Sequence, residues 1–166
     1  MGKPNRNRNA GHQWERDICI FFNKYSNLLP TVGSARNLSK FYDDNKVDIV
    51  TENMSEMDNM LLAIQAKTTT NTISYPKLLS VIRDRLKDPL RRDLIPIIFH
   101  RQTEAKGTRF YERDRFASLY LSDFMSIFTK MLAYKKGYEL LNKYFDSIPE
   151  EDKKPVGEEL ENIGLL

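Results

Sequence analysis

The chain has 166 residues, of which 40% are hydrophobic, and its formal net charge is +3. This length is typical of one domain with a sizeable core, and no run of about 18 apolar residues indicates a membrane span. The single cysteine, Cys19, excludes an internal disulfide and favours a reducing compartment. The polar start of the chain lacks the apolar run of a secretory signal, so we expect a cytoplasmic protein without a membrane partner.

The net charge conceals two regions of opposite sign. Residues 146–166 carry seven acids and two bases, which predicts an acidic C-terminal tail. Removing them from the totals of 23 acids and 26 bases leaves 16 acids and 24 bases in residues 1–145, a net charge of +8. A body this basic favours a polyanionic partner, most often nucleic acid, although a merely solubilising surface has the same composition. Residues 1–10 contain three bases and no acid, which predicts a basic N-terminal arm.

The first predicted element is a helix over residues 11–26. Its apolar residues recur at helical spacing and form one stripe, made of Trp14, Ile18, Phe21, Phe22 and Tyr25. Glu15 lies at the margin of this stripe, where its own helix is expected to half bury the carboxylate. A solvent-facing helix margin is the alternative. Residues 31–42 follow as a small, basic, hydroxyl-rich segment, expected to be a loop with one short strand.

Two short apolar strands are predicted next. Residues 47–51 form the first and residues 60–68 its antiparallel partner. The polar, acidic residues 52–59 between them are expected to be a hairpin connection.

A helix and a buried strand follow. The helix begins at Tyr75, with Ser74 as its cap, and stops at Asp88-Pro89. Residues 94–99 are the most apolar run of the chain and predict a buried strand, in which Pro96 indicates an edge or a bulge.

The chain ends in one more strand, over 108–119, and a long helix over 122–145 whose apolar stripe is expected to contact the core or another subunit. This order of elements predicts an α/β fold with a mixed central sheet flanked by helices. We therefore expect an N-terminal arm over 1–10, one α/β domain over 11–145 and an acidic tail over 146–166.

Three polar side chains are expected to meet where the two apolar strands pair. Asp48 lies at the start of the first strand, and Gln65 and Lys67 lie two residues apart on the second. Because side chains alternate across a strand, Gln65 and Lys67 project from one face. A carboxylate, an amide oxygen and an ammonium at one place can hold a divalent cation and a phosphate. The alternatives are a strand cap for Asp48 and a solvent-facing edge strand for the other two.

Together with Glu15, this pattern resembles the PD-(D/E)xK nuclease superfamily. The motifs are a glutamate on the first helix, a Ser/Arg-containing segment, an aspartate before an apolar strand and a residue-x-Lys pair, and they span roughly residues 11–101. The chain is most similar to the Holliday-junction-resolvase-like branch and to small endonuclease-like proteins of tailed (crAss-like) phages. The resemblance implies a restriction-endonuclease-like core, in which Glu15, Asp48 and Gln65 hold Mg²⁺ and Lys67 orients or activates the attacking water.

Five further residues are predicted to contact DNA. Ser34, Arg36 and Lys40 belong to the basic segment, close to the expected metal. His100 and Arg101 end the buried strand and are expected to reach backbone phosphates, with a strand-end packing role as the alternative for His100.

The chain departs from this family at Gln65, where Asp or Glu is more common. An amide oxygen can bind Mg²⁺ but contributes no charge, so metal affinity should fall. Two functions therefore stay open. One is a Mg²⁺-dependent DNA endonuclease or resolvase-like enzyme in the host cytoplasm. The other is a homo-oligomeric phage virion protein that contacts other virion proteins, such as a ring or connector at the DNA-entry vertex, with weak or lost catalysis. A DNA-binding module without catalysis is a third option.

Overall fold

The computed structural model describes residues 6–25, 30–71, 73–86, 94–106, 109–149 and residue 153. The chain divides into two compact units, residues 1–120 and 121–166, and each is described by itself. Residues 1–5 of the expected arm, most of the expected acidic tail and the predicted helix stop at Asp88-Pro89 lie outside the described residues.

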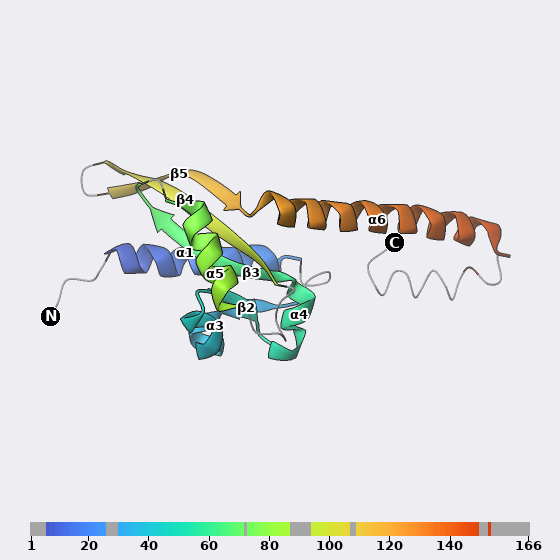
Figure 1. Ribbon diagram of the computed structural model, residues 1–166, viewed down its shortest axis with the longest axis horizontal. Coiled ribbons are helices and arrows are strands. Elements are labelled where there is room, and N and C mark those ends of the chain that lie inside the picture. Colours follow the sequence, from blue (N-terminus) through green and yellow to red (C-terminus); the bar gives the residue numbers. More distant parts are fainter. Residues whose placement is uncertain are drawn as a thin grey trace. The chain divides into compact units, whose positions relative to one another are not determined.

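A five-stranded mixed sheet lies at the centre of the described part of the first unit (Figure 1). In their order across the sheet, the strands are β1 (Val32–Ser34), β2 (Ile49–Thr51), β3 (Leu62–Thr69), β4 (Ile95–Lys106) and β5 (Arg109–Ser118). β3 and β4 run parallel, whereas the other neighbouring pairs are antiparallel. The predicted α/β fold with a mixed sheet is therefore confirmed.

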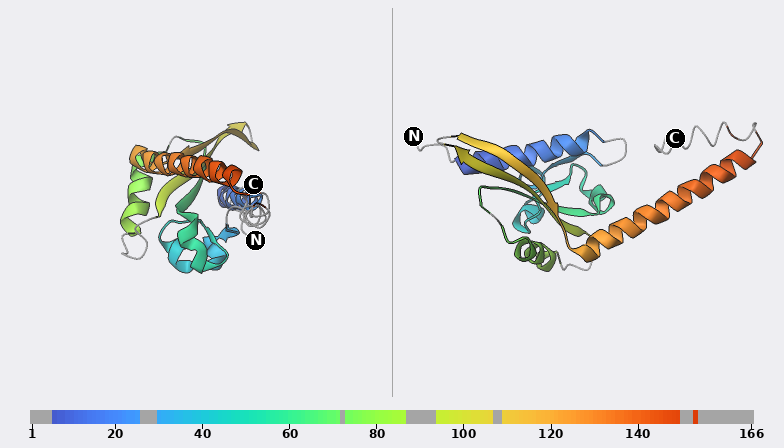
Figure 2. Two further views of the ribbon diagram at one scale, coloured as in Figure 1. Left: turned by 90° about the vertical axis from the view of Figure 1, so that its right-hand side faces the viewer. Right: turned by 90° about the horizontal axis from the view of Figure 1, so that it is seen from above.

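Helices cover both faces of this sheet. α1 (Arg6–Asn23) contacts β1 and β3, and its Phe22 ring lies 6.0 Å from the ring of Phe99 on β4. α5 (Tyr75–Arg85) joins the parallel strands β3 and β4, and the Tyr75 hydroxyl lies 2.8 Å from Nδ1 of His100. Phe99 and His100 are consecutive strand residues and point to opposite faces. The two helices therefore flank the sheet, as the right-hand view of Figure 2 shows.

α1 begins at Arg6, so residues 6–10 extend the helix and the predicted arm is too long at that end. The expected apolar stripe is buried only in part. Trp14, Ile18 and Phe22 are in the core, whereas Phe21 remains 59% exposed. At 100° per residue the buried arc runs from Trp14 through Ile18 to Phe22, and Phe21 lies just outside it.

Short helices fill the connections that the sequence predicted as loops. α2 (Ala35–Leu38) and α3 (Lys40–Asp44) follow β1, and η1 (Met54–Glu56) and α4 (Met57–Met60) join β2 to β3. The segment 52–59 connects two neighbouring antiparallel strands, as predicted, but it contains short helices where a loop was expected. Met57 and Met60 are buried and draw this polar segment onto the core, because residues three apart share a helix face.

The Pro96 prediction of an edge is confirmed. Pro96 pairs with Ala63 of β3 on one side, whereas the pairing of β4 with β5 begins at Ile98. At Pro96 the side of β4 that faces β5 is therefore unpaired, which suits a residue that has no N–H to donate.

The second unit contains α6 (Leu121–Ser147), a helix of 27 residues. None of the residues of α6 is buried. Within the described part of the chain, no helix is long and apolar enough to cross a membrane.

The end of α3 is a Schellman motif with a lysine at its left-handed position. Val47 N–H donates to the Tyr42 carbonyl, Lys46 N–H donates to the Asp43 carbonyl, and Lys46 has a φ of 67°. Glycine is preferred here, because a side chain in this conformation costs roughly 1–2 kcal/mol. We expect Lys46→Gly to raise the free energy of unfolding by about 1 kcal/mol in urea titrations. Lys46→Ala keeps the strain, so an equal gain from alanine would contradict this explanation.

Candidate metal and nucleic-acid site

Glu15 forms the first part of the candidate site and lies between α1 and β1. It is only 8% exposed. Its Oε2 accepts a hydrogen bond of 3.1 Å from Ser34 at the end of β1, and its Oε1 accepts one of 3.2 Å from Arg36 on α2. The structure thus brings together three of the predicted site residues, with both carboxylate oxygens of Glu15 bound to predicted DNA-contacting side chains.

A polar pocket of about 430 Å³ opens beside this cluster. Arg36, whose side chain is 39% exposed, also contacts His12, so its guanidinium spans the pocket. The lining residues come from α1, β1 and α2: His12, Glu15, Arg16, Cys19, Gly33, Ser34, Arg36 and Asn37. Burial, and to a smaller extent the charge of Glu15, raises the pKa of the Cys19 thiol to about 11. A thiol with this pKa is protonated at neutral pH and does not act as a nucleophile.

Asp48 forms the second part of the site, where β2 and β3 separate. Asp48 N–H donates to the Ile64 carbonyl at 2.7 Å, and the Asp48 carboxylate accepts a hydrogen bond of 2.8 Å from Ala66 N–H. The side chain thus takes the place of a backbone carbonyl. Burial raises the pKa of Asp48 to about 6; the Ala66 N–H and the charge of Lys67 act in the opposite direction, and the charge of Glu15 adds to the rise. Lys67 and Glu15 are therefore both close enough to act on Asp48.

Gln65 and Lys67 complete the site from β3. Gln65 is 2% exposed, and its Oε1 has no hydrogen-bond partner among the described residues. A buried acceptor without a partner costs about 1–3 kcal/mol, so such an atom needs a reason. Lys67 is half-buried and lies on the same face of β3 as Gln65.

Two of the predicted DNA contacts lie inside the protein. His100 is 1% exposed, with Nδ1 2.8 Å from the Tyr75 hydroxyl and Nε2 3.0 Å from the Thr69 hydroxyl, and burial lowers its pKa. Arg101 donates to Asp17 at 2.9 Å and to the Ala10 carbonyl at 2.8 Å. These internal contacts hold both side chains, and Arg101 Nε is buried without a hydrogen-bond partner among the described residues. Lys40, at the start of α3, is exposed.

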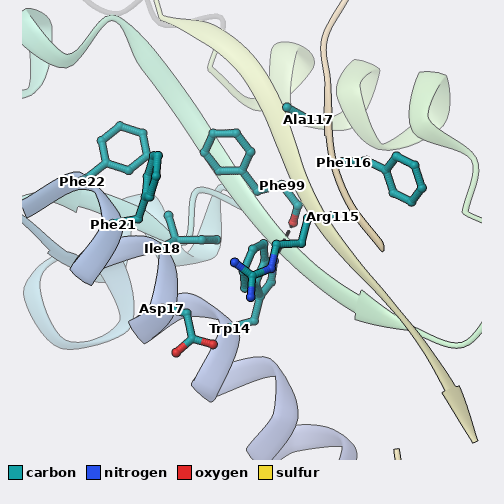
Figure 3. Close-up of a pocket in the computed structure, with 9 residues that line it drawn as sticks. All are labelled: Trp14, Asp17, Ile18, Phe21, Phe22, Phe99, Arg115, Phe116 and Ala117. Carbon is teal, nitrogen blue, oxygen red and sulfur yellow. Dashed lines mark hydrogen bonds between the residues drawn. The ribbon is translucent and has the colours of Figure 1, made fainter. Parts of the chain in front are cut away.

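A second, mainly apolar pocket of about 260 Å³ lies between α1 and the β4–β5 hairpin (Figure 3). Trp14 donates from Nε1 to the Phe99 carbonyl at 2.9 Å. The guanidinium carbons of Arg101 and Arg115 lie 5.1 Å and 5.5 Å from its ring centre, and Figure 3 shows Arg115 against that ring. Sequence reasoning missed Arg115, because a charged residue on an exposed strand gives no signal of the tryptophan it covers.

The oxygen atoms that these residues offer fit Mg²⁺, although few of them carry a negative charge. No three His, Cys, Asp or Glu side chains gather into a metal-binding group in the part of the chain that the structure describes. Mg²⁺, however, needs only one or two carboxylates and keeps several waters. Asp48 supplies one carboxylate and the partnerless Oε1 of Gln65 supplies a neutral oxygen. Glu15 supplies a second negative charge nearby, although its oxygens are already bound to Ser34 and Arg36.

No protein-family model matches the chain, and neither a curated protein nor a solved structure is significantly similar to it.

Because the pKa of Asp48 is raised, we expect the free energy of unfolding to depend on pH. An unfolded aspartate ionises near pH 4, whereas folded Asp48 holds its proton up to about pH 6. Its contribution to stability is therefore most favourable below pH 4 and is lost as the pH rises through 6. We expect Asp48→Asn to gain stability relative to wild type between pH 4 and pH 7.5, by on the order of 2 kcal/mol in urea titrations. A stability difference that does not change with pH would contradict the assignment.

Proposed function

We propose that the chain is a Mg²⁺-dependent DNA nuclease of the PD-(D/E)xK type. The observation that carries this proposal is the buried Gln65 Oε1, which has no hydrogen-bond partner among the described residues and lies on β3 next to Ala66, whose N–H binds the Asp48 carboxylate. A cation bound to both oxygens would satisfy the amide and stabilise the ionised carboxylate.

The order of the elements supports the same proposal. Apart from the short helices between β1, β2 and β3, a helix, three strands, a helix and a further strand follow one another as α1, β1, β2, β3, α5 and β4. This is the order that the resemblance implies for a restriction-endonuclease-like core. β5 and α6 are additions to it.

The electrostatics of the site also favour a cation. The charge of Glu15 raises the pKa of Asp48, so the two carboxylates repel each other. Arg36 offsets part of that charge through its ion pair with Glu15. A divalent cation bound at Asp48 would offset the rest of the repulsion.

The roles of the side chains in hydrolysis follow from their positions. Bound Mg²⁺ supplies charge neutralisation at the phosphate and lowers the pKa of a coordinated water. Asp48 and Gln65 would hold the cation through a carboxylate and an amide oxygen. Lys67, two residues beyond Gln65 on the same face, orients the attacking water and stabilises negative charge on the phosphate. Arg36 and Lys40 are exposed cations suited to attracting the DNA backbone.

A cleavage assay tests this function. Plasmid and four-way-junction DNA are incubated with Mg²⁺ and wild-type protein, Asp48→Asn or Lys67→Met. We expect metal-dependent cleavage that falls at least about 100-fold in both variants, as for removal of an acid–base group or a metal ligand.

The matched controls are Asp44→Asn and Lys77→Met, which remove the same charges from exposed positions on α3 and α5. These controls should cleave at the wild-type rate. Absence of Mg²⁺-dependent cleavage by the wild type, or equal rates in all five proteins, would refute the nuclease proposal.

Gln65→Glu tests the metal site without relying on activity. The added carboxylate should tighten Mg²⁺ binding by roughly tenfold, because Mg²⁺ prefers charged oxygen ligands. Thermal unfolding measured over a Mg²⁺ titration reports this affinity, since a ligand of the folded state raises the melting temperature. The melting temperature of Asp48→Asn should not respond to Mg²⁺. If wild type, Gln65→Glu and Asp48→Asn respond equally, the cation binds elsewhere.

A second function is an assembly protein that reuses this fold. It is favoured by the low charge available to a metal at the candidate site. Gln65 contributes no charge, and both oxygens of Glu15 are occupied by Ser34 and Arg36. Salt-sensitive DNA binding without cleavage, together with no Mg²⁺ response in either Gln65→Glu or wild type, would support this role over the enzyme. The virion is the expected location in that case, and the host cytoplasm if the chain is an enzyme.

A further inference from the structure

α6 presents many apolar side chains to solvent. Phe124, Met131, Leu132 and Tyr134 are between 48% and 77% exposed. A soluble surface with this many large apolar groups along one helix marks an interaction site. α6 belongs to the second unit and carries none of the residues of the proposed nuclease site.

Seven apolar residues of α6 follow a seven-residue repeat, whereas other exposed apolar residues of the helix, such as Leu132 and Leu140, fall outside it. Phe124, Met131, Tyr138 and Phe145 are spaced by seven, and Ile127, Tyr134 and Leu141 each lie three residues after one of them. This alternation of three and four is the a/d pattern of a coiled coil, which keeps one seam facing a partner helix along its length. A seam of this kind is completed by another helix, not by a flat surface or a small ligand.

We propose that the a/d seam of α6 is a homodimer interface, in which the helices of two copies pair antiparallel. In the alignment that pairs six of the seven seam residues, Phe124 packs beside Leu141 of the second copy and Met131 beside its Tyr134. An antiparallel pair has two-fold symmetry, so each contact occurs twice and the assembly closes as a dimer.

The charges beside the seam select this orientation. Lys130 lies immediately before an a position, and Lys135 lies immediately after a d position. In a parallel pair these flanking positions face each other, so Lys130 of each copy would lie beside Lys135 of the other. In the antiparallel alignment Lys130 instead lies beside Gly137 and Lys135 beside Phe128, and the like charges are separated.

The area available is enough for a stable interface. Four of the seam residues in each copy are aromatic: Phe124, Tyr134, Tyr138 and Phe145. An aromatic side chain can bury about 150–250 Å². Phe124, Tyr134 and Tyr138 are 48%, 77% and 37% exposed and Phe145 is half-buried, so complete burial of the eight aromatics of a dimer removes at most about 700 Å² from solvent. Met131, which is 59% exposed, and the remaining seam residues bring the total toward the roughly 1,200 Å² of stable interfaces.

The oligomeric state of the full chain tests the proposal. Light scattering after size exclusion, at about 10 to 100 μM protein, should give a dimer for the wild type. Tyr134→Asp, which changes a seam residue that is 77% exposed, should be monomeric. Leu140→Asp makes the same kind of change at a residue that is 58% exposed on the same helix but outside the seam, and should remain a dimer. Because both side chains are exposed, neither change should unfold the protein.

The outcomes that overturn the proposal are distinct. A wild-type monomer over this range would mean that residues 150–166 of the same chain or a different protein cover the seam. An oligomer that survives Tyr134→Asp would mean that copies associate through another surface.

Disulfide cross-linking tests the orientation. Cys19 is the only cysteine, so Cys19→Ser provides a background without thiols. In that background the double variant Phe124→Cys/Leu141→Cys should form an intermolecular disulfide, whereas Phe124→Cys alone should not. The two positions lie about 25 Å apart along one helix, which excludes a bond within a single chain. Efficient cross-linking of Phe124→Cys alone would show a parallel pair and overturn the antiparallel arrangement.

Discussion

The hydrogen bond from the Ala66 backbone to the Asp48 carboxylate is the contact on which the candidate site depends. It lies where β2 leaves β3, and the side chain continues the ladder in place of a backbone carbonyl. This holds a carboxylate at the sheet interior, where burial raises its pKa to about 6. The bound residue, Ala66, lies between Gln65 and Lys67, which share one face of β3, and the charge of Lys67 acts on the Asp48 carboxylate. The geometry of the site is therefore a property of strand pairing, not of a flexible loop.

The polar groups of the candidate site reduce the stability of the fold, and this is a reason to expect a functional role for them. A buried carboxylate with a raised pKa and a buried amide oxygen without a partner among the described residues both reduce stability. The rest of the fold compensates with an apolar core in which Ile49, Ile64 and Ile98 are fully buried around the site. Polar groups kept at a cost within such a core are typical of binding and catalytic sites. The second unit contains the exposed apolar helix α6, on which the proposed dimer rests, and nuclease activity and dimer formation are compatible within one chain.

The sequence predicted much of this because the relevant signals are local. Strand alternation was enough to place Gln65 and Lys67 on one face, and Tyr75-Pro76 marked the start of α5. Tertiary contacts decided the rest. The polar segment 52–59 became helical because Met57 and Met60 reach the core, and His100 and Arg101 were drawn inside by Tyr75 and Asp17. The pairing of Glu15 with Arg36 joins α1 to α2, and no periodicity in either segment indicates it.

Titration of the Asp48 carboxyl group by carbon-detected NMR, with and without Mg²⁺, tests the central claim most directly. Without the cation we expect a pKa near 6, and with millimolar Mg²⁺ we expect that pKa to fall well below 5, because a bound cation opposes protonation. The fall should be smaller in Gln65→Ala. A carboxyl group that titrates near pH 4 and does not respond to Mg²⁺ would contradict both the burial of Asp48 and its role as a metal ligand.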